Sequence, residues 1–148
     1  MHTCRTAAIL AGTLLCVRIS PHAQTSRTFK TRLSPVPIDL AMQATITGSG
    51  SLTAVLNGNK LTFTGTFDGL AAPATIAQVR KGPVAGVRGP VVFDLTVTHA
   101  TSGTISGSGD LTPGLLTDLE HRRLYVQIHS EKAPDGNLWG WLFEVVGH

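Results

Sequence analysis

The sequence is poor in cysteine, aromatic residues and charge. Its 148 residues contain two cysteines, five phenylalanines, two tryptophans and one tyrosine, and charged residues make up 14%. Both cysteines, Cys4 and Cys16, lie near the N-terminus. A chain that lost this segment would have no thiol, which excludes disulfides, cysteine-ligated zinc and a cysteine nucleophile. Its stability would then come from an apolar core and from the hydrogen-bonded sheet, and a chain of about 125 residues can bury enough apolar surface for such a core.

The N-terminal segment has the pattern of a secretory signal peptide. Arg5 supplies positive charge, and residues 6–17 form an apolar run of the length typical of such signals. The run is too short to span a bilayer, and Arg18 ends it. We predict cleavage after Ala23, so that residues 1–23 are the signal peptide and no transmembrane segment remains after its removal. The expected location is secreted or periplasmic.

Removal of the signal peptide lowers the net charge. The whole chain carries +3 at pH 7, and loss of Arg5 and Arg18 reduces this excess. The one compact basic group is His121, Arg122 and Arg123, which follows a predicted helix, where positive charge is favourable. No second basic cluster accompanies it, so no nucleic-acid partner is expected.

Most of the chain after residue 42 has the pattern of short β-strands. Leu61, Phe63 and Phe67 alternate with threonines, which is typical of a strand with one apolar and one hydroxyl face. Gly65 interrupts the apolar face, which indicates close approach of another backbone segment. Strands are predicted at residues 29–33, 51–56, 61–67, 74–80, 90–98, 101–111, 124–130 and 138–145.

A short helix and many turn signals complete the predicted fold. Thr112 is a candidate N-cap, Pro113 suits the first helical position, and leucines follow at helical spacing, so one helix is predicted near residues 113–121. The frequent short strands predict an all-β, antiparallel β-sandwich. Residues 42–148 are assigned to this domain. Residues 24–41 are assigned to a linker and a first strand, which Ser34-Pro-Val-Pro37 is expected to break.

Five segments stand out by their order and spacing along the chain. They are Asn57-Gly-Asn-Lys-Leu-Thr-Phe-Thr64, Phe67-Asp-Gly-Leu70, Gly89-Pro-Val-Val-Phe-Asp-Leu95, Leu124-Tyr-Val-Gln-Ile-His129 and Pro134-Asp-Gly136. Together they resemble the CHRD domain, a family named from chordin and common in exported bacterial proteins, from about residue 57 to 142. The resemblance implies an immunoglobulin-like or superoxide-dismutase-like β-sandwich; in chordin, such domains belong to an extracellular protein that binds growth factors.

The departures from the family pattern bear on function. Members usually carry a His-x-His strand before the glycine-rich loop, where this chain has Gln78 and Arg80. They usually end with Gly-Glu-Ile-Arg-Gly, where Asn137 and Trp139 replace the acid and the arginine. Two histidines on one strand face can share a metal with a third. This chain supplies only His129, so no metal or other cofactor is expected. A copper or zinc protein, or a superoxide-dismutase-like oxidoreductase with a residual site at His129, is the alternative.

No catalytic constellation emerges from the sequence. It has no Gly-x-Ser-x-Gly elbow, no carboxylate pair with glycosidase spacing and no phosphate-binding loop. Asp94 faces away from its apolar neighbours and is expected to form a structural ion pair with Arg80 or Arg88 rather than to act as a base. The protein is therefore predicted not to be an enzyme.

The last predicted strand is apolar on both faces. Trp139, Trp141 and Phe143 alternate on one face, with Leu138 and Leu142 on the other. In one interpretation, the rings form an exposed ledge that binds a partner or a sugar. In the other, Trp139 and Trp141 fill the core and the leucines pack under the helix. The second interpretation is preferred, because two tryptophans are a large share of a small core.

Together these observations predict a binding or structural module of the cell envelope or exterior. Its partner is expected to be an unidentified protein or carbohydrate. The candidate surface requires the strands at 74–80 and 124–130 to be neighbours. It comprises Gln78, Arg80, Gln127 and His129, joined by Trp139 and Trp141.

Overall fold

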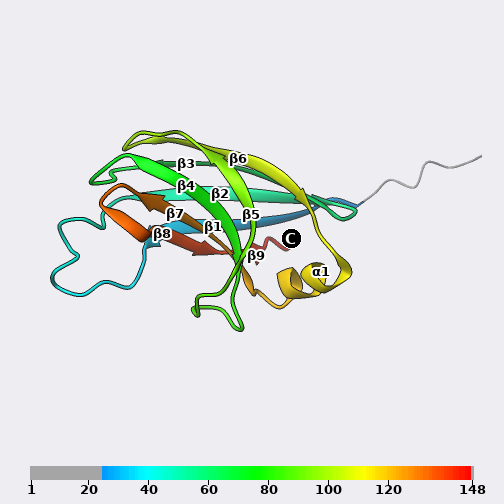
Figure 1. The fold of residues 1–148 in the computed structure, drawn as a ribbon. Helices are drawn as coiled ribbons and strands as arrows, with labels where there is room; N and C mark the ends of the chain where they lie inside the picture. Colours follow the sequence, from blue (N-terminus) through cyan, green and yellow to red (C-terminus); the bar gives the residue numbers. More distant parts are fainter. Residues whose placement is uncertain (1–24, 148) are drawn as a thin grey trace, which may run out of the picture.

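A computed structural model describes residues 25–147 of the chain. The predicted signal peptide, residues 1–23, lies outside the described residues. The described part contains nine strands and one helix, coloured along the chain in Figure 1. They are β1 (Arg27–Pro35), β2 (Ser49–Asn57), β3 (Lys60–Asp68), β4 (Ala74–Lys81), β5 (Val91–Val97), β6 (Gly103–Asp110), α1 (Pro113–Glu120), β7 (Leu124–Ser130), β8 (Ala133–Trp141) and β9 (Phe143–Glu144).

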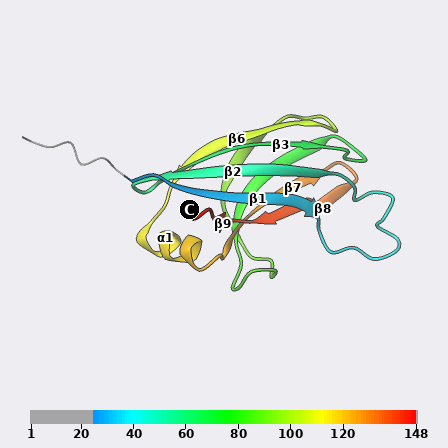
Figure 2. The same cartoon turned by 180° about the vertical axis from the view of Figure 1, so that it is seen from behind.

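The strands form one antiparallel ladder that closes on itself. Its order is β2-β3-β6-β5-β4-β7-β8-β1, and β1 pairs back to β2. β9 continues the path of β8 along β1, because Ser34 opposite Trp139 and Lys30 opposite Phe143 share one register. The β5–β6 seam is short, with two register pairs, Thr96 with Ser106 and Val97 with Ile105. Figure 2 shows β1, β2, β3 and β6 from the opposite side.

Ring closure changes the predicted architecture. The all-β antiparallel fold with one short helix is confirmed, but the eight strands close into a barrel rather than leaving the two separate sheets of a sandwich. The physical reason lies in β1 and β5, each of which hydrogen-bonds to both halves of the ladder. Closure removes the free strand edges that a sandwich would leave.

The barrel interior holds the main hydrophobic core. Leu61, Phe63 and Phe67 point inward and are at most 3% exposed, which confirms the alternation of the β3 segment. The predicted close approach at Gly65 is also present: a Cβ atom there would lie 2.5 Å from the Ser51 carbonyl oxygen. Any larger residue at this position would therefore push β2 and β3 apart.

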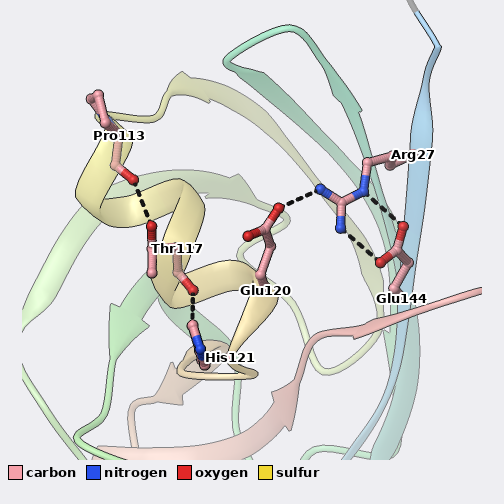
Figure 3. Close-up of polar contacts among 6 residues, drawn as sticks. All are labelled: Arg27, Pro113, Thr117, Glu120, His121 and Glu144. Carbon is pink, nitrogen blue, oxygen red and sulfur yellow. Dashed lines mark hydrogen bonds and ion pairs between the residues drawn. The ribbon is translucent and has the colours of Figure 1, made fainter.

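Helix α1 packs at one end of the barrel. The Thr112 side chain accepts a hydrogen bond from the Leu115 amide at 3.3 Å, and Pro113 occupies the first turn, as predicted. Leu119 is buried against the core. Figure 3 shows Arg27 bridging Glu120 of α1 and Glu144 of β9, with both ion pairs at 2.7 Å. These pairs join the helix to β1 and to the end of the chain.

Strands β1 and β8 extend beyond their predicted bounds and include proline residues. Ser34-Pro-Val-Pro37 does not break β1 at residue 34, because Ser34 and Pro35 pair with β8. Strand β8 begins at Ala133, before the predicted start at residue 138, and includes Pro134 and Gly136. The β7–β8 register shifts between Ile128 and Ser130, so that the extra residues 134–137 of β8 are accommodated opposite His129. Since β1 completes the ring, residues 27–35 of the predicted linker and first strand belong to the same sheet as the strands that follow.

Candidate binding site

The outer face of β7 is buried, unlike a typical barrel exterior. Leu124, Val126 and Ile128 point into the core, whereas Tyr125, Gln127 and His129 point outward. All three outward side chains are at most 6% exposed. Tyr125 contacts the loop of residues 82–90 at Gly89, and Gln127 and His129 line a hollow together with residues of the loop 36–48. Both loops extend beyond the barrel in Figure 1. The site is therefore an outer layer built on the sheet β4-β7-β8.

The structure brings together the strands of the candidate surface. β4 and β7 are hydrogen-bonded neighbours, with Gln78 opposite Gln127 and Arg80 opposite Tyr125. β8 pairs with the other edge of β7 and places Trp139 opposite Gln127. The predicted adjacency of these strands is thus confirmed.

A hollow of about 600 Å³ opens on this face. Arg80, Gln127 and His129 of the predicted candidate surface line this hollow, whereas Gln78, Trp139 and Trp141 do not. Sequence patterns gave no signal for the apolar wall that the 36–48 loop supplies, nor for the role of Arg88. The lining residues are Val36, Pro37, Met42, Ile46, Arg80, Arg88, Gln127, His129, Pro134, Asp135 and Gly136.

The two arginines of the hollow are held by carbonyl and amide oxygens. Arg80 donates from Nε to the Gly89 carbonyl at 3.0 Å and from Nη1 to Gln78 Oε1 at 3.3 Å. Arg88 donates to the Asp135 carbonyl at 3.0 Å. Neither forms an ion pair within residues 25–147. Both guanidinium groups therefore keep N–H donors and have no carboxylate in ion-pair contact.

The ion pair predicted for Asp94 is not formed. Asp94 instead accepts a hydrogen bond from Gln78 Nε2 at 2.9 Å. Gln78 uses its other amide atom, Oε1, as an acceptor for Arg80. The amide group thus lies between the two charged groups, because Gln78 sits directly opposite Asp94 in the β4–β5 register.

The floor of the hollow consists of Gln127 and His129. Gln127 Nε2 donates to the Asp135 carbonyl at 2.9 Å, and His129 Nδ1 lies 2.8 Å from the Pro134 carbonyl. Since a carbonyl only accepts, we assign the proton to Nδ1, which makes Nε2 an acceptor. Within the described residues, His129 Nε2 and Gln127 Oε1 have no hydrogen-bond partner.

Burial keeps His129 neutral. It lowers the pKa of the imidazole below its ordinary value, and the nearby charges of Arg80 and Arg88 act in the same direction. The hydrogen bond to the Pro134 carbonyl and the Asp135 carboxylate oppose this shift without cancelling it. At neutral pH the floor therefore offers two uncharged acceptors beneath two cations.

The tryptophans belong to the outer layer and not to the core. Trp141 is 8% exposed and lies against Tyr125 with ring centroids 4.3 Å apart. Trp139 is half-buried, with the Arg88 guanidinium 5.9 Å from its ring centroid. Leu138 and Leu142 occupy the core. The preferred interpretation is correct in that Trp141 is buried, but the rings lie outside the main barrel core, which Leu138 and Leu142 occupy instead. The exposed ledge is reduced to the half-buried ring of Trp139.

The loop over the aromatic rings is anchored at Gly89. The Tyr125 hydroxyl accepts a hydrogen bond from the Gly89 amide at 3.0 Å, while Arg80 binds the carbonyl of the same residue. Gly82 also lies against Trp141, since a Cβ atom there would be 2.6 Å from the indole ring. These contacts explain why a glycine-rich loop is needed next to bulky rings.

The remaining histidines do not join the site. His99 and His121 are exposed, and His121 Nδ1 lies 2.7 Å from the Thr117 carbonyl at the end of α1 (Figure 3). Across residues 25–147, no group of three or more His, Cys, Asp or Glu side chains is placed to hold a metal ion. In the same range, no helix has the length and apolar character needed to cross a membrane.

Comparison with known proteins gives one match. The family model of the CHRD domain matches residues 31–142. No curated protein and no solved structure matches the chain. The matched range includes part of β1 and all strands from β2 to β8, and therefore also every residue that lines the hollow.

Proposed function

The chain belongs to the CHRD domain family, and we propose that it is an exported, non-catalytic binding module of the cell envelope or exterior. The observation that carries this proposal is the hollow beside His129. Two fully covered polar side chains, Gln127 and His129, line it, and each keeps one acceptor without a partner in the described part of the chain. An unpaired buried acceptor costs about 1–3 kcal/mol, a cost that a ligand donor removes.

The chemistry around the hollow supports recognition more than reaction. Its lining contains no Ser, Thr, Cys or Lys side chain and one carboxylate, that of Asp135. General acid–base catalysis by paired carboxylates therefore has no second partner in the lining. Arginines, neutral acceptors and an apolar wall are instead the groups that orient and hold a bound molecule. A carbohydrate or a segment of a protein at the cell envelope fits this description.

Export is tested by fractionation of a bacterial host that expresses the full chain. We expect the protein in the periplasm or the medium, with Gln24 as its first residue after removal of residues 1–23. A cytoplasmic product that retains the N-terminal segment would contradict export.

Binding is tested by NMR titration of the full chain with neutral sugars, sugar acids, hydroxy acids and short peptides. At least one probe should shift the amide signals of Arg88 and Gly136, which line the hollow. The control is Lys60→Gln, which removes one exposed charge at the β2–β3 hairpin and should leave the shifts unchanged. If no probe moves the signals of the lining residues, the binding proposal fails.

A metal protein centred on His129 is the second candidate. The unpartnered and unprotonated Nε2 atom favours it, because neutral imidazole is a common metal ligand. The donor set fits poorly, since Arg80 and Arg88 repel a cation and no second histidine lines the hollow. Elemental analysis of protein purified from the periplasm decides the matter: stoichiometric copper or zinc that is lost in His129→Ala would establish this reading.

A further inference from the structure

Resting on the proposed binding function, we infer that the hollow binds a hydroxycarboxylate, a small molecule or sugar unit that carries a carboxylate and a neighbouring hydroxyl group. Two different sets of side chains meet in the hollow. Arg80 and Arg88 are cationic donors, while Gln127 and His129 present neutral acceptors. A ligand must therefore supply an anionic acceptor and a neutral donor at once.

The arginines select the acidic group. Arg80 uses two of its N–H groups on Gly89 and Gln78, and Arg88 uses one on Asp135, out of the five that each guanidinium carries. The remaining donors match the two oxygens of a carboxylate. The Asp135 carboxylate also lines the hollow and offsets one of the two positive charges, which leaves a net attraction for a single anion.

The floor selects the hydroxyl group. His129 Nε2 accepts because Nδ1 is committed to the Pro134 carbonyl, and Gln127 Oε1 accepts because Nε2 is committed to the Asp135 carbonyl. Each free acceptor atom exposes less than 1 Å². A donor that bonds to either atom has to displace part of the cover over it, and a hydroxyl, which is about the size of a water molecule, requires little displacement. A plain carboxylate without a hydroxyl leaves both acceptors unpaired.

The size of the hollow and its apolar wall limit the ligand further. A volume of about 600 Å³ accommodates a sugar unit or a small organic acid. Val36, Met42 and Ile46 line one side and can pack against carbon atoms of the ligand. The same chemistry occurs in a free hydroxy acid and in the uronic acid unit of a polysaccharide, and the experiment includes both.

The experiment compares matched ligand pairs by NMR titration of the full chain. Glucuronate is paired with glucose, which lacks the carboxylate, and lactate with propionate, which lacks the hydroxyl. We expect the acid with hydroxyl groups to bind at least about tenfold more tightly than its partner in each pair. If glucuronate binds more tightly than lactate, the ligand is a sugar acid. If lactate binds more tightly, the ligand is a free hydroxy acid.

Two variants separate the roles of the charged and neutral groups. Arg88→Gln, on an exposed side chain, should weaken glucuronate about tenfold and leave glucose unchanged, whereas Lys60→Gln should affect neither. His129→Phe should reduce the difference between lactate and propionate, because one of the two floor acceptors is lost. Equal binding of glucuronate and glucose at the hollow would overturn the hydroxycarboxylate inference while the binding function stands. An absence of shifts with every probe of the wider panel would reject both.

Discussion

Asn137→Asp should destabilise the protein, because it places a carboxylate against a carbonyl oxygen. Asn137 is fully buried on β8. Its Nδ2 donates to the Thr47 carbonyl at 2.8 Å, and its Oδ1 accepts from the Ser130 hydroxyl at 3.0 Å. Its backbone carbonyl also accepts from the Val36 amide at 3.1 Å. The residue thus fastens both ends of the 36–48 loop to the sheet.

The magnitude follows from the loss of one donor. Aspartate has the same shape, so packing is conserved and the Ser130 bond remains. The Thr47 carbonyl loses its partner and faces a negative charge, which costs about 2–4 kcal/mol at neutral pH. Protonation restores a donor, so the pKa of the new carboxyl is raised in the folded state above its unfolded value of about 3.9. The folded variant then binds more protons than the unfolded chain, and its deficit shrinks as the pH falls toward the unfolded pKa.

Urea denaturation followed by tryptophan fluorescence measures this effect. Wild type and variant are compared at about pH 7.5 and about pH 4.5, so that ionisations common to both cancel in the difference. Ser130→Ala is the control, since it removes a neutral hydrogen bond of about 1 kcal/mol and should show the same deficit at both pH values. A stable Asn137→Asp protein at neutral pH, or a deficit that does not change with pH, would refute the reasoning.

Three further predictions concern the core, the floor of the hollow and the tryptophans. Phe63→Ala should cost about 3–5 kcal/mol in urea denaturation, because Phe63 is fully buried in the barrel, and a loss below about 1 kcal/mol would contradict this. The stability that depends on a neutral His129 should be complete above about pH 6.5 and should decline as the pH falls toward the lowered folded-state pKa of this residue. The charged groups that face His129 are Arg80, Arg88 and Asp135. His129→Gln should flatten that decline; equal slopes would exclude His129 as its cause. Trp139→Phe leaves Trp141 and should give blue-shifted emission that acrylamide quenches weakly, whereas Trp141→Phe leaves the half-buried Trp139 and should be quenched more strongly.

Much of the fold was predictable because its signals are local. The alternation of Leu61, Phe63 and Phe67 with threonines assigns one strand and its inner face. Thr112 and Pro113 mark the start of α1, because capping depends on the next three residues alone. The segments that resemble the CHRD domain also identified the family, which the match over residues 31–142 confirms.

Local signals failed where a distant strand supplied the partner. Pro35 stays in β1 because β8 pairs with it, and Pro134 and Gly136 stay in β8 because the β7–β8 register shifts around them. Asp94 does not meet an arginine because the register places Gln78 opposite it. None of these pairings can be inferred from the residues next to Pro35, Pro134 or Asp94. Local propensity and spacing therefore predict shorter strands at the two prolines and an ion pair at Asp94.

The sequence alone determined the strand faces, the helix start, the family and the set of strands that carry the polar residues. Only the tertiary structure decided the closed ring and the burial of the outer face of β7 beside the 36–48 and 82–90 loops. It also decided that Arg88 and Asp135 join Gln127 and His129 around one hollow. The physical reason is that periodicity fixes which way a side chain points from its own strand. What covers that side chain depends on segments far away in the chain.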